Sequence, residues 1–414
     1  MVINNYLEQI NCRICNNSKL VEIVSLGNQF LSGIFPKSID DQLISGPLSL
    51  VKCCGLNSCG LVQMKHNFDR DIMYGDNYGY RSGLNSSMVE HLKTKTEKLK
   101  SIIDLNNEDV VLDIGSNDGT TLNFFKNNNL NLIGIDPTAK NFINYYSDEI
   151  TIIPEYFSEN LFKNKYGKRK AKIIMSFSMF YDLPQPLDFM NEIKSILKED
   201  GIWALEQSYL PFMLKTNSYD TICHEHYEYY SLKAIKFMTD KLDLKIIDIE
   251  FNNVNGGSFS LIIAHKDSEY SEFNSLGDLL TKEKNLSDLG TYELFETRIK
   301  KAKRDINETL LNLRNDGHTV AGIGASTKGN VLLQYCNIDS TLIKCIGEVN
   351  KSKYGCFTPG SNIPIVSEDE VLNNNNYEYL LILPWHFKNF FINSKKFKGK
   401  KLIFALPQVE IINN

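Results

Sequence analysis

The fold of this chain is decided by one stretch, Val110-Val111-Leu112-Asp113-Ile114-Gly115-Ser116-Asn117-Asp118-Gly119-Thr120. Apolar residues lead into an acid, and a loop bounded by two glycines then opens a segment of helical character. This order predicts a β-strand, a tight turn and a helix N-terminus whose first N–H groups have no partner inside the helix. Residues 130–136 predict the next strand, which ends in Asp136. An acid at the end of that second strand suits the hydroxyls of a ribose.

The glycines of this loop do not fit the nicotinamide dinucleotide fingerprint. G-x-G-x-x-G requires three glycines at fixed spacing, and residues 115–119 supply two at a different spacing. The form D-x-G-x-N-x-G resembles motif I of class I methyltransferases that use S-adenosylmethionine (SAM), and this resemblance implies a SAM site. The expected contacts are Asp113, Gly115, Ser116, Asn117, Gly119 and Asp136. A plain strand–turn–helix unit without a ligand is the alternative.

Length and composition describe a soluble protein of several domains. A chain of 414 residues is too long for one ordinary core, and its 42% apolar and 23% charged residues are typical of globular proteins. The net charge of −5 and the lack of a basic run argue against a nucleic-acid partner. No stretch approaches 18 uninterrupted apolar residues, and the N-terminus lacks the features of a signal peptide. We therefore expect a cytoplasmic protein without a membrane partner.

Nine cysteines, an odd number, point to metal ligands or free thiols rather than to a disulfide framework. Cys12 and Cys15 form a C-x-x-C knuckle, and Cys53, Cys54 and Cys59 follow further along the chain. Four thiolates suit a tetrahedral zinc ion. We expect Cys12, Cys15, Cys53 and Cys59 to hold a structural zinc, and prefer Cys53 to Cys54 because an alternating strand runs straight into it. A reduced cluster of buried thiols without metal is the alternative.

An aromatic and glycine-rich segment follows at residues 67–86. The hydroxyls of Tyr78 and Tyr80 and the guanidinium of Arg81 could reach a sugar or a phosphate across a cleft. We name these three residues as candidate substrate contacts. A packed linker explains the segment equally well, and helical spacing begins directly after it, at residues 86–104.

After the second strand the chain continues to alternate strands and helices. Strands are expected at residues 150–153, 171–177 and 201–207, a helix at 187–197, and a closing hairpin at 244–251 and 258–265. This pattern predicts an α/β fold, a doubly wound sheet with an antiparallel final hairpin, which favours a methyltransferase over a nicotinamide-binding sheet. Ligands of such sheets bind beyond the C-terminal ends of the strands. The second group of expected cofactor contacts lies there, with Gln207 beside it: Tyr156, Phe157 and Phe177.

A further group of chemically active side chains follows the fifth strand, at His224-Glu225-His226. In an extended segment the two histidines share one face. Neutral histidine suits proton removal near pH 7, and a carboxylate beside it can orient the ring. We therefore name all three as candidate catalytic residues. A metal site here lacks an obvious third ligand, and a solvated loop histidine is the remaining alternative.

Residues 275–315 predict a connecting helix pair, and a second, smaller α/β unit follows it. Residues 319–330 repeat the order of strand, glycine turn and helix, and Lys328 beside the turn would suit a phosphate. Further strands are expected at 342–347, 363–366, 379–383 and 401–405. A second SAM or NAD site and a docking unit without a ligand are the alternatives, because the glycine pattern is incomplete for either cofactor.

Taken together, these motifs resemble one family. The C-x-x-C knuckle, the loop at 113–119, His224-Glu225-His226, Gly256-Gly257-Ser258 and residues 324–330 occur together in the SAM-dependent C-methyltransferases that act on nucleotide-linked keto-deoxysugars. The resemblance implies a zinc-binding domain at 1–70, a class I methyltransferase domain at 71–266 and a Rossmann-like domain for the nucleotide sugar at 267–414. Many members have a tyrosine where this chain has Cys223. The further substrate contacts expected are Cys223, Asn255, Gly256 and Lys328.

The resemblance also implies a reaction that begins at a ketone. His226 would remove a proton from the adjacent carbon, and His224 or a tyrosine would stabilise the resulting oxyanion. Glu225 would orient an imidazole, and the carbanion would attack the methyl group of SAM. We expect a monomer that acts on a nucleotide-diphosphate sugar in deoxysugar or surface-polysaccharide biosynthesis. Methylation of a sugar hydroxyl, or a sugar-nucleotide-binding or epimerase relative without methyl transfer, are the alternatives.

Overall fold

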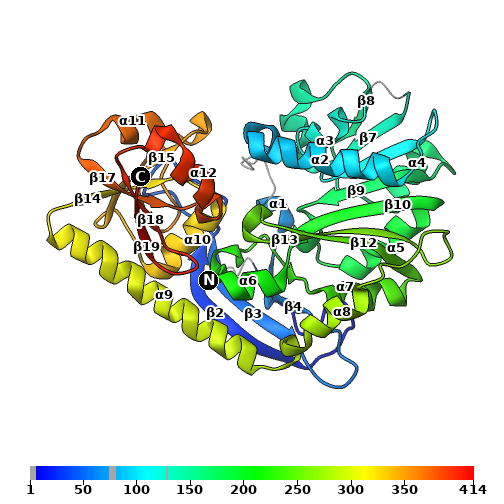
Figure 1. The fold of residues 1–414 in the computed structure, drawn as a ribbon, viewed down its shortest axis with the longest axis horizontal. Helices are drawn as coiled ribbons and strands as arrows, with labels where there is room; N and C mark the ends of the chain where they lie inside the picture. The colour runs from blue at the N-terminus through cyan, green and yellow to red at the C-terminus, as the bar shows by residue number, and fades with distance from the viewer. Residues whose placement is uncertain (1–5, 74–80, 127–128) are drawn as a thin grey trace.

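The computed structural model describes residues 6–73, 81–126 and 129–414, and this part of the chain forms four sheets (Figure 1). Three of them, with seven, six and four strands, build most of the molecule. The fourth is a small ribbon in which β1 (Tyr6–Glu8) pairs with β5 (His66–Phe68). In Figure 1 the seven-stranded sheet lies to the right, the six-stranded sheet to the left and the four-stranded sheet below and between them.

The four-stranded sheet contains residues from two distant parts of the chain. Its N-terminal strands β2 (Leu20–Phe30), β3 (Ser45–Cys53) and β4 (Val62–Met64) pair antiparallel. The remaining strand, β11 (Glu228–Tyr229), comes from the segment just after His226 and pairs with β4. The N-terminal part of the chain therefore holds one end of the candidate catalytic segment.

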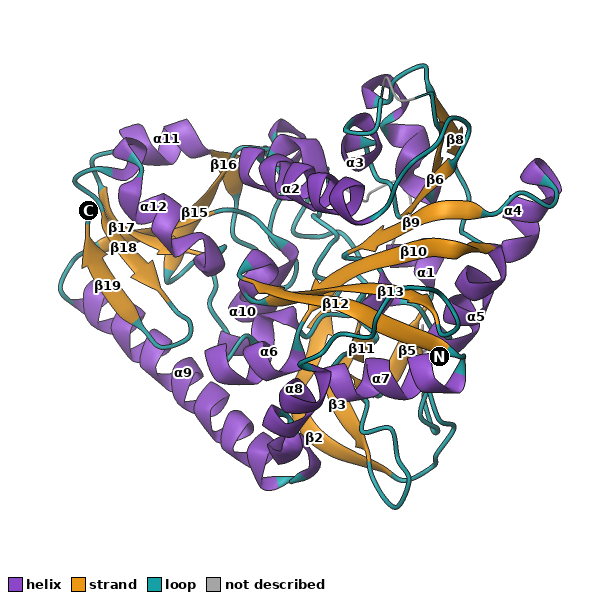
Figure 2. Ribbon diagram, turned by 45° about the vertical axis from the view of Figure 1, so that its right-hand side comes forward, coloured by secondary structure: helices purple, strands orange, loops and turns teal. Residues whose placement is uncertain are grey.

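The seven-stranded sheet has the strand order β12-β13-β10-β9-β6-β7-β8. Figure 2 shows its neighbouring strands β9 and β10 side by side. Its parallel strands are β6 (Val110–Ile114), β7 (Asn131–Ile135), β8 (Ile150–Ile153), β9 (Ala171–Phe177) and β10 (Leu197–Ser208). The strand β13 (Ser258–His265) runs antiparallel between β10 and β12 (Leu244–Asn252). The predicted doubly wound sheet with an antiparallel final hairpin is therefore confirmed.

Helices cover both faces of this sheet, because the side chains of each strand alternate between the faces. The central strand β6 shows this alternation. Leu112 belongs to the core under α5 (Pro186–Ile196) and α7 (Leu232–Lys241), whereas Val111 belongs to the core under α2 (Ser86–Ile102). The shorter helices of this half of the chain are α1 (Arg70–Met73), α3 (Thr120–Asn123), α4 (Glu159–Tyr166) and α6 (Leu210–Thr216).

The six-stranded sheet is the second α/β unit expected from the sequence, with strand order β16-β15-β14-β17-β18-β19. Its strands are β14 (Thr319–Ile323), β15 (Ile343–Glu348), β16 (Ile365–Ser367), β17 (Tyr377–Ile382), β18 (Lys401–Phe404) and β19 (Glu410–Asn413). Its helices are α10 (Thr327–Cys336), α11 (Glu368–Asn373) and α12 (Lys388–Asn393). The antiparallel edge strand β19 is absent from the sequence prediction, because its four mostly exposed residues show no apolar alternation.

One long helix, rather than a pair of similar helices, connects the seven-stranded and six-stranded sheets. After the short α8 (Leu276–Lys282), α9 (Gly290–Asn315) runs along the lower side of the molecule in Figure 1 and contacts both β2 and β14. Its buried residues Phe295, Ile299 and Ile306 share one hydrophobic core with the four-stranded and six-stranded sheets. The N-terminal and C-terminal parts of the chain therefore pack together around α9. None of the helices described here has the length and apolar character needed to cross a bilayer.

Candidate functional site

Four cysteines gather where β3 ends. The sulfur atoms of Cys12, Cys15, Cys53 and Cys59 all lie within 4.8 Å of one another. Cys53 is the last residue of β3 and is fully buried, as predicted, whereas Cys54 lies outside the group. Four sulfur ligands at this spacing fit a tetrahedral zinc ion, and they leave no position open for a substrate. The geometry is that of a structural site.

Arg13, inside the C-x-x-C knuckle, connects these cysteines to strand β11. Its side chain is fully buried, and Nε lies 3.4 Å from Oε1 of Glu228, which is fully buried as well. The backbone N–H of Arg13 donates to Gln63, and Nη1 donates to the carbonyl of Met64, both on β4. Burial lowers the pKa of Arg13 and raises the pKa of Glu228, and the opposite charge of each partner offsets part of this effect. The knuckle, β4 and β11 thus form one packed unit.

A cavity opens at the C-terminal ends of β6, β7 and β9 and holds about 1160 Å³ of empty space, which includes space open to solvent. It lies where the strand order of the sheet reverses, which is the usual ligand position in such folds. The predicted cofactor contacts that line it are Asp113, Gly115, Ser116, Asn117, Asp136, Tyr156, Phe157 and Phe177. Lining residues that sequence reasoning missed include Met88, Leu92, Ser178, Met179 and Asp182. Gln207, expected nearby, is fully buried and does not line the cavity.

The loop after β6 takes its shape from Gly115 and Asp136. Gly115 has a φ of +76°, and a Cβ atom there would lie 3.0 Å from the side chain of Met179, so the position suits glycine alone. One oxygen of Asp136 accepts the backbone N–H of Asn117 at 2.8 Å, and the other accepts that of Thr138 at 2.6 Å. The carboxylate is therefore fixed before any ligand arrives, and its remaining lone pairs are available to hydroxyl groups.

Asp113 places a buried acid, which shares a hydrogen bond with the side chain of Thr121, in the wall of the cavity. Its side chain is buried, and burial together with the charge of Asp136 raises the pKa of Asp113 well above its usual range. No cation is among the groups that shift this pKa in the described part of the chain. A ligand that carries positive charge would stabilise the ionised acid. SAM carries such a charge, so the residues present fit this cofactor.

Two other predicted contacts shape the cofactor loop without lining the cavity. The ring of Tyr146 fills the space beside Gly119, 2.6 Å from where a Cβ atom would lie. Arg81 stacks on Tyr145, with Cζ 3.9 Å from the ring centre, and its Nε lies 3.9 Å from a carboxylate oxygen of Asp118. Arg81, expected to contact the substrate, therefore braces the loop. Two further candidates lie outside the described residues, Tyr78 and Tyr80.

The segment around His226 is a turn rather than an extended strand, because the N–H of His226 donates to the carbonyl of Cys223 at 3.2 Å. The expectation that the two histidines share one face is therefore wrong. His224 has no exposed surface; its Nε2 lies 3.3 Å from the carbonyl of Gly46, and its ring meets Phe68 edge-on. Burial lowers the pKa of His224 to about 4. His224 packs against the N-terminal strands instead of reaching the cavity.

His226 is half-buried and does not itself line the cavity. Its ring centre lies 4.3 Å from that of Tyr181, and the residue after Tyr181, Asp182, lines the cavity. Nδ1 of His226 lies 2.9 Å from the carbonyl oxygen of Thr221. Since a carbonyl oxygen only accepts, Nδ1 carries the proton and Nε2 keeps its lone pair. Burial and the charge of Lys328 lower the pKa of His226 to about 3, so the ring is neutral at neutral pH.

Glu225 and Cys223 differ from their expected roles, because the turn directs their side chains elsewhere. The carboxylate of Glu225 packs against the backbone of Gly33, and Oε1 lies 2.8 Å from where a Cβ atom of Gly33 would be. Glu225 thus ties the turn to the segment after β2 instead of orienting an imidazole. Cys223 has no exposed surface and belongs to the hydrophobic core, so it does not contact a substrate in this arrangement.

The six-stranded sheet contributes two residues to this region, Lys328 and Trp385. Nζ of Lys328 donates to the carbonyl of Asn255, in the turn between β12 and β13, at 2.7 Å. Trp385 packs beside Gly256, and its Nε1 donates to Oδ2 of Asp220 at 2.8 Å. Burial lowers the pKa of Lys328, and the negative charge of the buried Asp220 offsets part of this effect. Sequence reasoning missed Asp220, because its partner is far away along the chain.

Comparisons with known proteins agree with this geometry. Family models described as "Putative zinc binding domain", "Methyltransferase domain" and "C-methyltransferase C-terminal domain" match residues 12–74, 87–249 and 253–407. The C-methyltransferase NovU of Streptomyces niveus is 28% identical over 97% of this chain and 96% of its own length. The chain thus carries the three domains of a C-methyltransferase. This C-methyltransferase uses SAM as its cofactor, and its four clustered cysteines are the ligands of a structural zinc.

Two solved structures resemble less than half of the C-methyltransferase chain. The precorrin-6y C5,15-methyltransferase of Geobacter metallireducens has a TM-score of 0.31 and 12% identity, over 46% of this chain and 96% of that one. The plantazolicin methyltransferase BpumL, solved with SAH, has a TM-score of 0.34 and 12% identity, over 42% of this chain and 82% of that one. Likenesses of this size carry no information about the substrate.

Proposed function

We propose that this C-methyltransferase methylates a carbon atom next to the ketone of a nucleotide-linked keto-deoxysugar, with His226 as the base. The observation that carries the proposal is the neutral imidazole beside the cofactor cavity. Its Nδ1–H is fixed on the carbonyl of Thr221, so Nε2 is the atom that can accept a proton. SAM, when bound, supplies an electrophilic methyl group. Proton removal and methyl transfer would then take place side by side.

The substrate itself would strengthen the base. In the free protein, burial and the ammonium group of Lys328 disfavour the imidazolium form of His226 and lower its pKa to about 3. A nucleotide diphosphate brings negative charge into the site, and the enolate that forms brings more. Negative charge nearby raises the pKa of a histidine. We therefore propose that His226 becomes an effective base only when the substrate is in place.

Lys328 is the residue that we propose for stabilising the enolate oxygen. His224, expected in this role from the sequence, is fully buried against Gly46 and Phe68. Lys328 comes from α10, and the carbonyl of Asn255 holds its Nζ in place. A fixed, partly buried ammonium group favours a developing negative charge more than a solvated one does. The diphosphate role expected from the glycine turn would instead affect substrate affinity.

We propose that the substrate lies where three domains meet. These are a zinc-binding domain at 1–70, a SAM-binding domain at 71–266 and a nucleotide-sugar-binding domain at 267–414. Contacts between the parts support this position. Strand β11 joins the N-terminal sheet, and Nδ2 of Asn330 on α10 donates to the carbonyl of Ser32 at 2.7 Å. A single chain of this design, acting as a monomer in the cytoplasm, would hold both the cofactor and a soluble sugar nucleotide.

The substitution His226→Asn tests the base. Asparagine keeps a polar side chain but takes up no proton at neutral pH. We expect methyl transfer to a nucleotide-linked keto-sugar to fall by about a hundredfold or more, the usual size of a general-base contribution. SAM affinity, measured by calorimetry, should stay within about threefold of the unmodified protein, because His226 lies beside the cavity and does not line it. Undiminished turnover would refute the assignment.

Two controls separate the neighbouring explanations. His224→Asn should lower the melting temperature while the folded protein retains its turnover, because His224 is a packing residue. Incubation of enzyme and substrate in deuterated water without SAM should place deuterium on the carbon next to the ketone. Methyl transfer to oxygen with no deuterium incorporation would support methylation of a hydroxyl group instead.

A further inference from the structure

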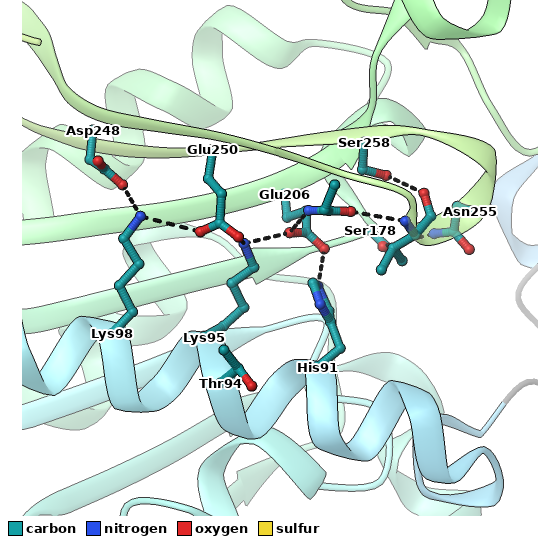
Figure 3. A network of polar contacts seen from close by, with 12 residues as sticks. His91, Thr94, Lys95, Lys98, Ser178, Glu206, Asp248, Glu250, Asn255 and Ser258 are labelled. Carbon is teal, nitrogen blue, oxygen red and sulfur yellow. Dashed lines mark hydrogen bonds and ion pairs between the residues drawn. The ribbon is translucent and has the colours of Figure 1, made fainter.

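Glu206 lies at the centre of a polar network between helix α2 and the end of β10 (Figure 3). Its side chain is only 4% exposed, and its Oε1 lies 2.5 Å from Nε2 of His91 on α2. Nζ of Lys95, one turn further along α2, lies 3.1 Å from Oε2. Asn252, the last residue of β12, donates its Nδ2–H to the same oxygen at 2.7 Å. One buried carboxylate thus binds side chains from two separate elements.

The first of these elements belongs to the cofactor side of the active centre. His91 is placed on α2 between Met88 and Leu92, and both of these residues line the SAM cavity. The position of α2 against the sheet therefore sets part of the cavity wall. The bonds from His91 and Lys95 to Glu206 fix that position.

The second element, the end of β12 with Asn252, leads into the turn that contacts Lys328. Oδ1 of Asn252 accepts the N–H of Val254 at 2.9 Å, and this bond starts the turn η6 (Val254–Gly256). The carbonyl of Asn255 in that turn accepts Nζ of Lys328. Ser178, which lines the cavity, donates its N–H to the backbone carbonyl of Glu206 at 2.7 Å, so the main chain of Glu206 also contacts the cavity wall. The carboxylate of Glu206 therefore contacts both α2, which forms part of the cavity wall, and Asn252, which precedes the turn that holds Lys328.

We infer that Glu206 is a positioning residue that sets α2 over the SAM cavity and η6 against Lys328 at the same time, so that binding of SAM and binding of the second substrate favour one arrangement. The SAM half of this inference follows from the fold and the family. The half that concerns the second substrate rests on the proposed function, because it takes η6 and Lys328 as part of the substrate site.

The negative charge of Glu206 allows its carboxylate to bind all three of these side chains. Burial would raise the pKa of Glu206, but the hydrogen bond with His91 and the charge of Lys95 outweigh burial and lower it. The two oxygens of the ionised group serve His91, Lys95 and Asn252 together. A glutamine has the same shape but carries no charge and has only one acceptor oxygen, so it loses the ion pair with Lys95 and cannot accept hydrogen bonds at both positions.

Glu206→Gln is therefore the first test. We expect SAM affinity, measured by calorimetry without the second substrate, to fall about tenfold, the effect of losing roughly one charge-assisted hydrogen bond. The KM for the sugar substrate should rise by a similar factor, while kcat at saturation changes less. The matched control is Glu250→Gln. Glu250 is 40% exposed and pairs with Lys95 and Lys98 in the same network, so both constants should stay within about twofold.

Coupling between the two sides is the second test. His91→Gln should weaken SAM binding and also raise the KM for the sugar, and Asn252→Ala should raise that KM and also weaken SAM binding. In a Glu206→Gln background these cross-effects should vanish, because the linking carboxylate is gone. A loss of melting temperature with both constants unchanged would show a merely structural role and overturn the inference. Cross-effects that persist without Glu206 would overturn it as well.

The inference can still be tested if Glu206→Gln does not fold or if no nucleotide sugar is turned over. If Glu206→Gln does not fold, His91→Gln and Asn252→Ala still decide the question. The coupling is contradicted if His91→Gln changes only SAM affinity and Asn252→Ala changes only the KM for the sugar. If no nucleotide sugar is turned over, the proposed function fails, whereas SAM affinity measured without substrate still reads the effect of Glu206 on α2.

Discussion

A single ammonium group, that of Lys328, shows whether the six-stranded sheet takes part in the chemistry or only in binding. If it stabilises the enolate, Lys328→Met should lower kcat by about 10²–10³-fold and leave the KM for the sugar almost unchanged, as for the loss of a donor to an oxyanion. Steady-state kinetics at saturating SAM measure both constants. Lys351→Met removes an exposed charge from the same unit and serves as the control. A rise in KM alone would assign Lys328 to the diphosphate.

Buried histidine also makes stability depend on pH, and His226 gives the cleanest test. Its pKa is about 3 in the folded chain, whereas a histidine in an unfolded chain titrates near about 6.5. Between these values the unfolded state binds more protons, so this term lowers the free energy of unfolding as pH falls, by up to about 1.4 kcal/mol per pH unit. Buried acids with raised pKa, such as Glu228, act in the opposite direction.

Comparison with a variant separates the contribution of His226 to the pH dependence of stability from the contribution of those acids. Relative to the unmodified protein, His226→Asn should gain stability steadily as the pH is lowered from about 6.5 to 4.5, because the variant lacks the group that protonates on unfolding. Urea unfolding at several pH values measures the difference. A difference that stays constant with pH would mean that His226 titrates normally in the folded state.

At the scale of elements, prediction succeeded where the deciding signal was local. The run Val110–Ile114 is apolar throughout and leads into a glycine turn, so both the strand and its loop could be recognised. Strand β11 could not, because two residues carry no periodicity and its partner β4 is remote in sequence. The turn at His226 was missed for a related reason: the backbone bond to Cys223 cancels the alternation expected of an extended segment.

The contact between the zinc knuckle and β11 is the element-level feature that carries a prediction. Arg13→Met would leave the carboxylate of Glu228 buried without its partner, which costs about 3–5 kcal/mol of stability. The double variant Arg13→Met/Glu228→Leu should recover most of that loss, since apolar side chains can replace a buried ion pair. Urea unfolding of the two variants and the unmodified protein measures this. A double variant no more stable than Arg13→Met would show that the unpaired carboxylate of Glu228 is not the cause of the lost stability.

At the scale of the whole molecule, the site combines residues whose spacing along the chain follows no rule. The cysteines and the loop at 113–119 could be predicted, because their geometry is set within one knuckle or one turn. The pair Asp220–Trp385 could not, since it forms only when the six-stranded sheet packs against the end of the seven-stranded one. The same holds for α2, which packs over one face of the sheet and brings only its N-terminal residues Met88 and Leu92 to the cavity.

This assembly predicts that zinc affects catalysis more than cofactor binding. Cys12, Cys53 and Cys59 share a hydrophobic core with Tyr230 and Leu232, which lie just beyond the turn of His226. Removal of the metal should loosen that core and the pairing of β11 with β4, and so displace His226. The SAM cavity is lined by elements that hold none of the four cysteines.

We therefore expect protein stripped of zinc by a chelator to lose methyl transfer by about a hundredfold, the cost of displacing a catalytic group by about 1 Å. SAM affinity should stay within about threefold, and added zinc should restore activity. Metal content, calorimetry with SAM and the methyl-transfer assay on one sample measure all three. Full activity in metal-free protein would show that the knuckle does not hold the turn of His226 in place. Parallel loss of SAM binding would show that the seven-stranded sheet also depends on the metal, because a purely local loosening at β11 leaves the cavity intact.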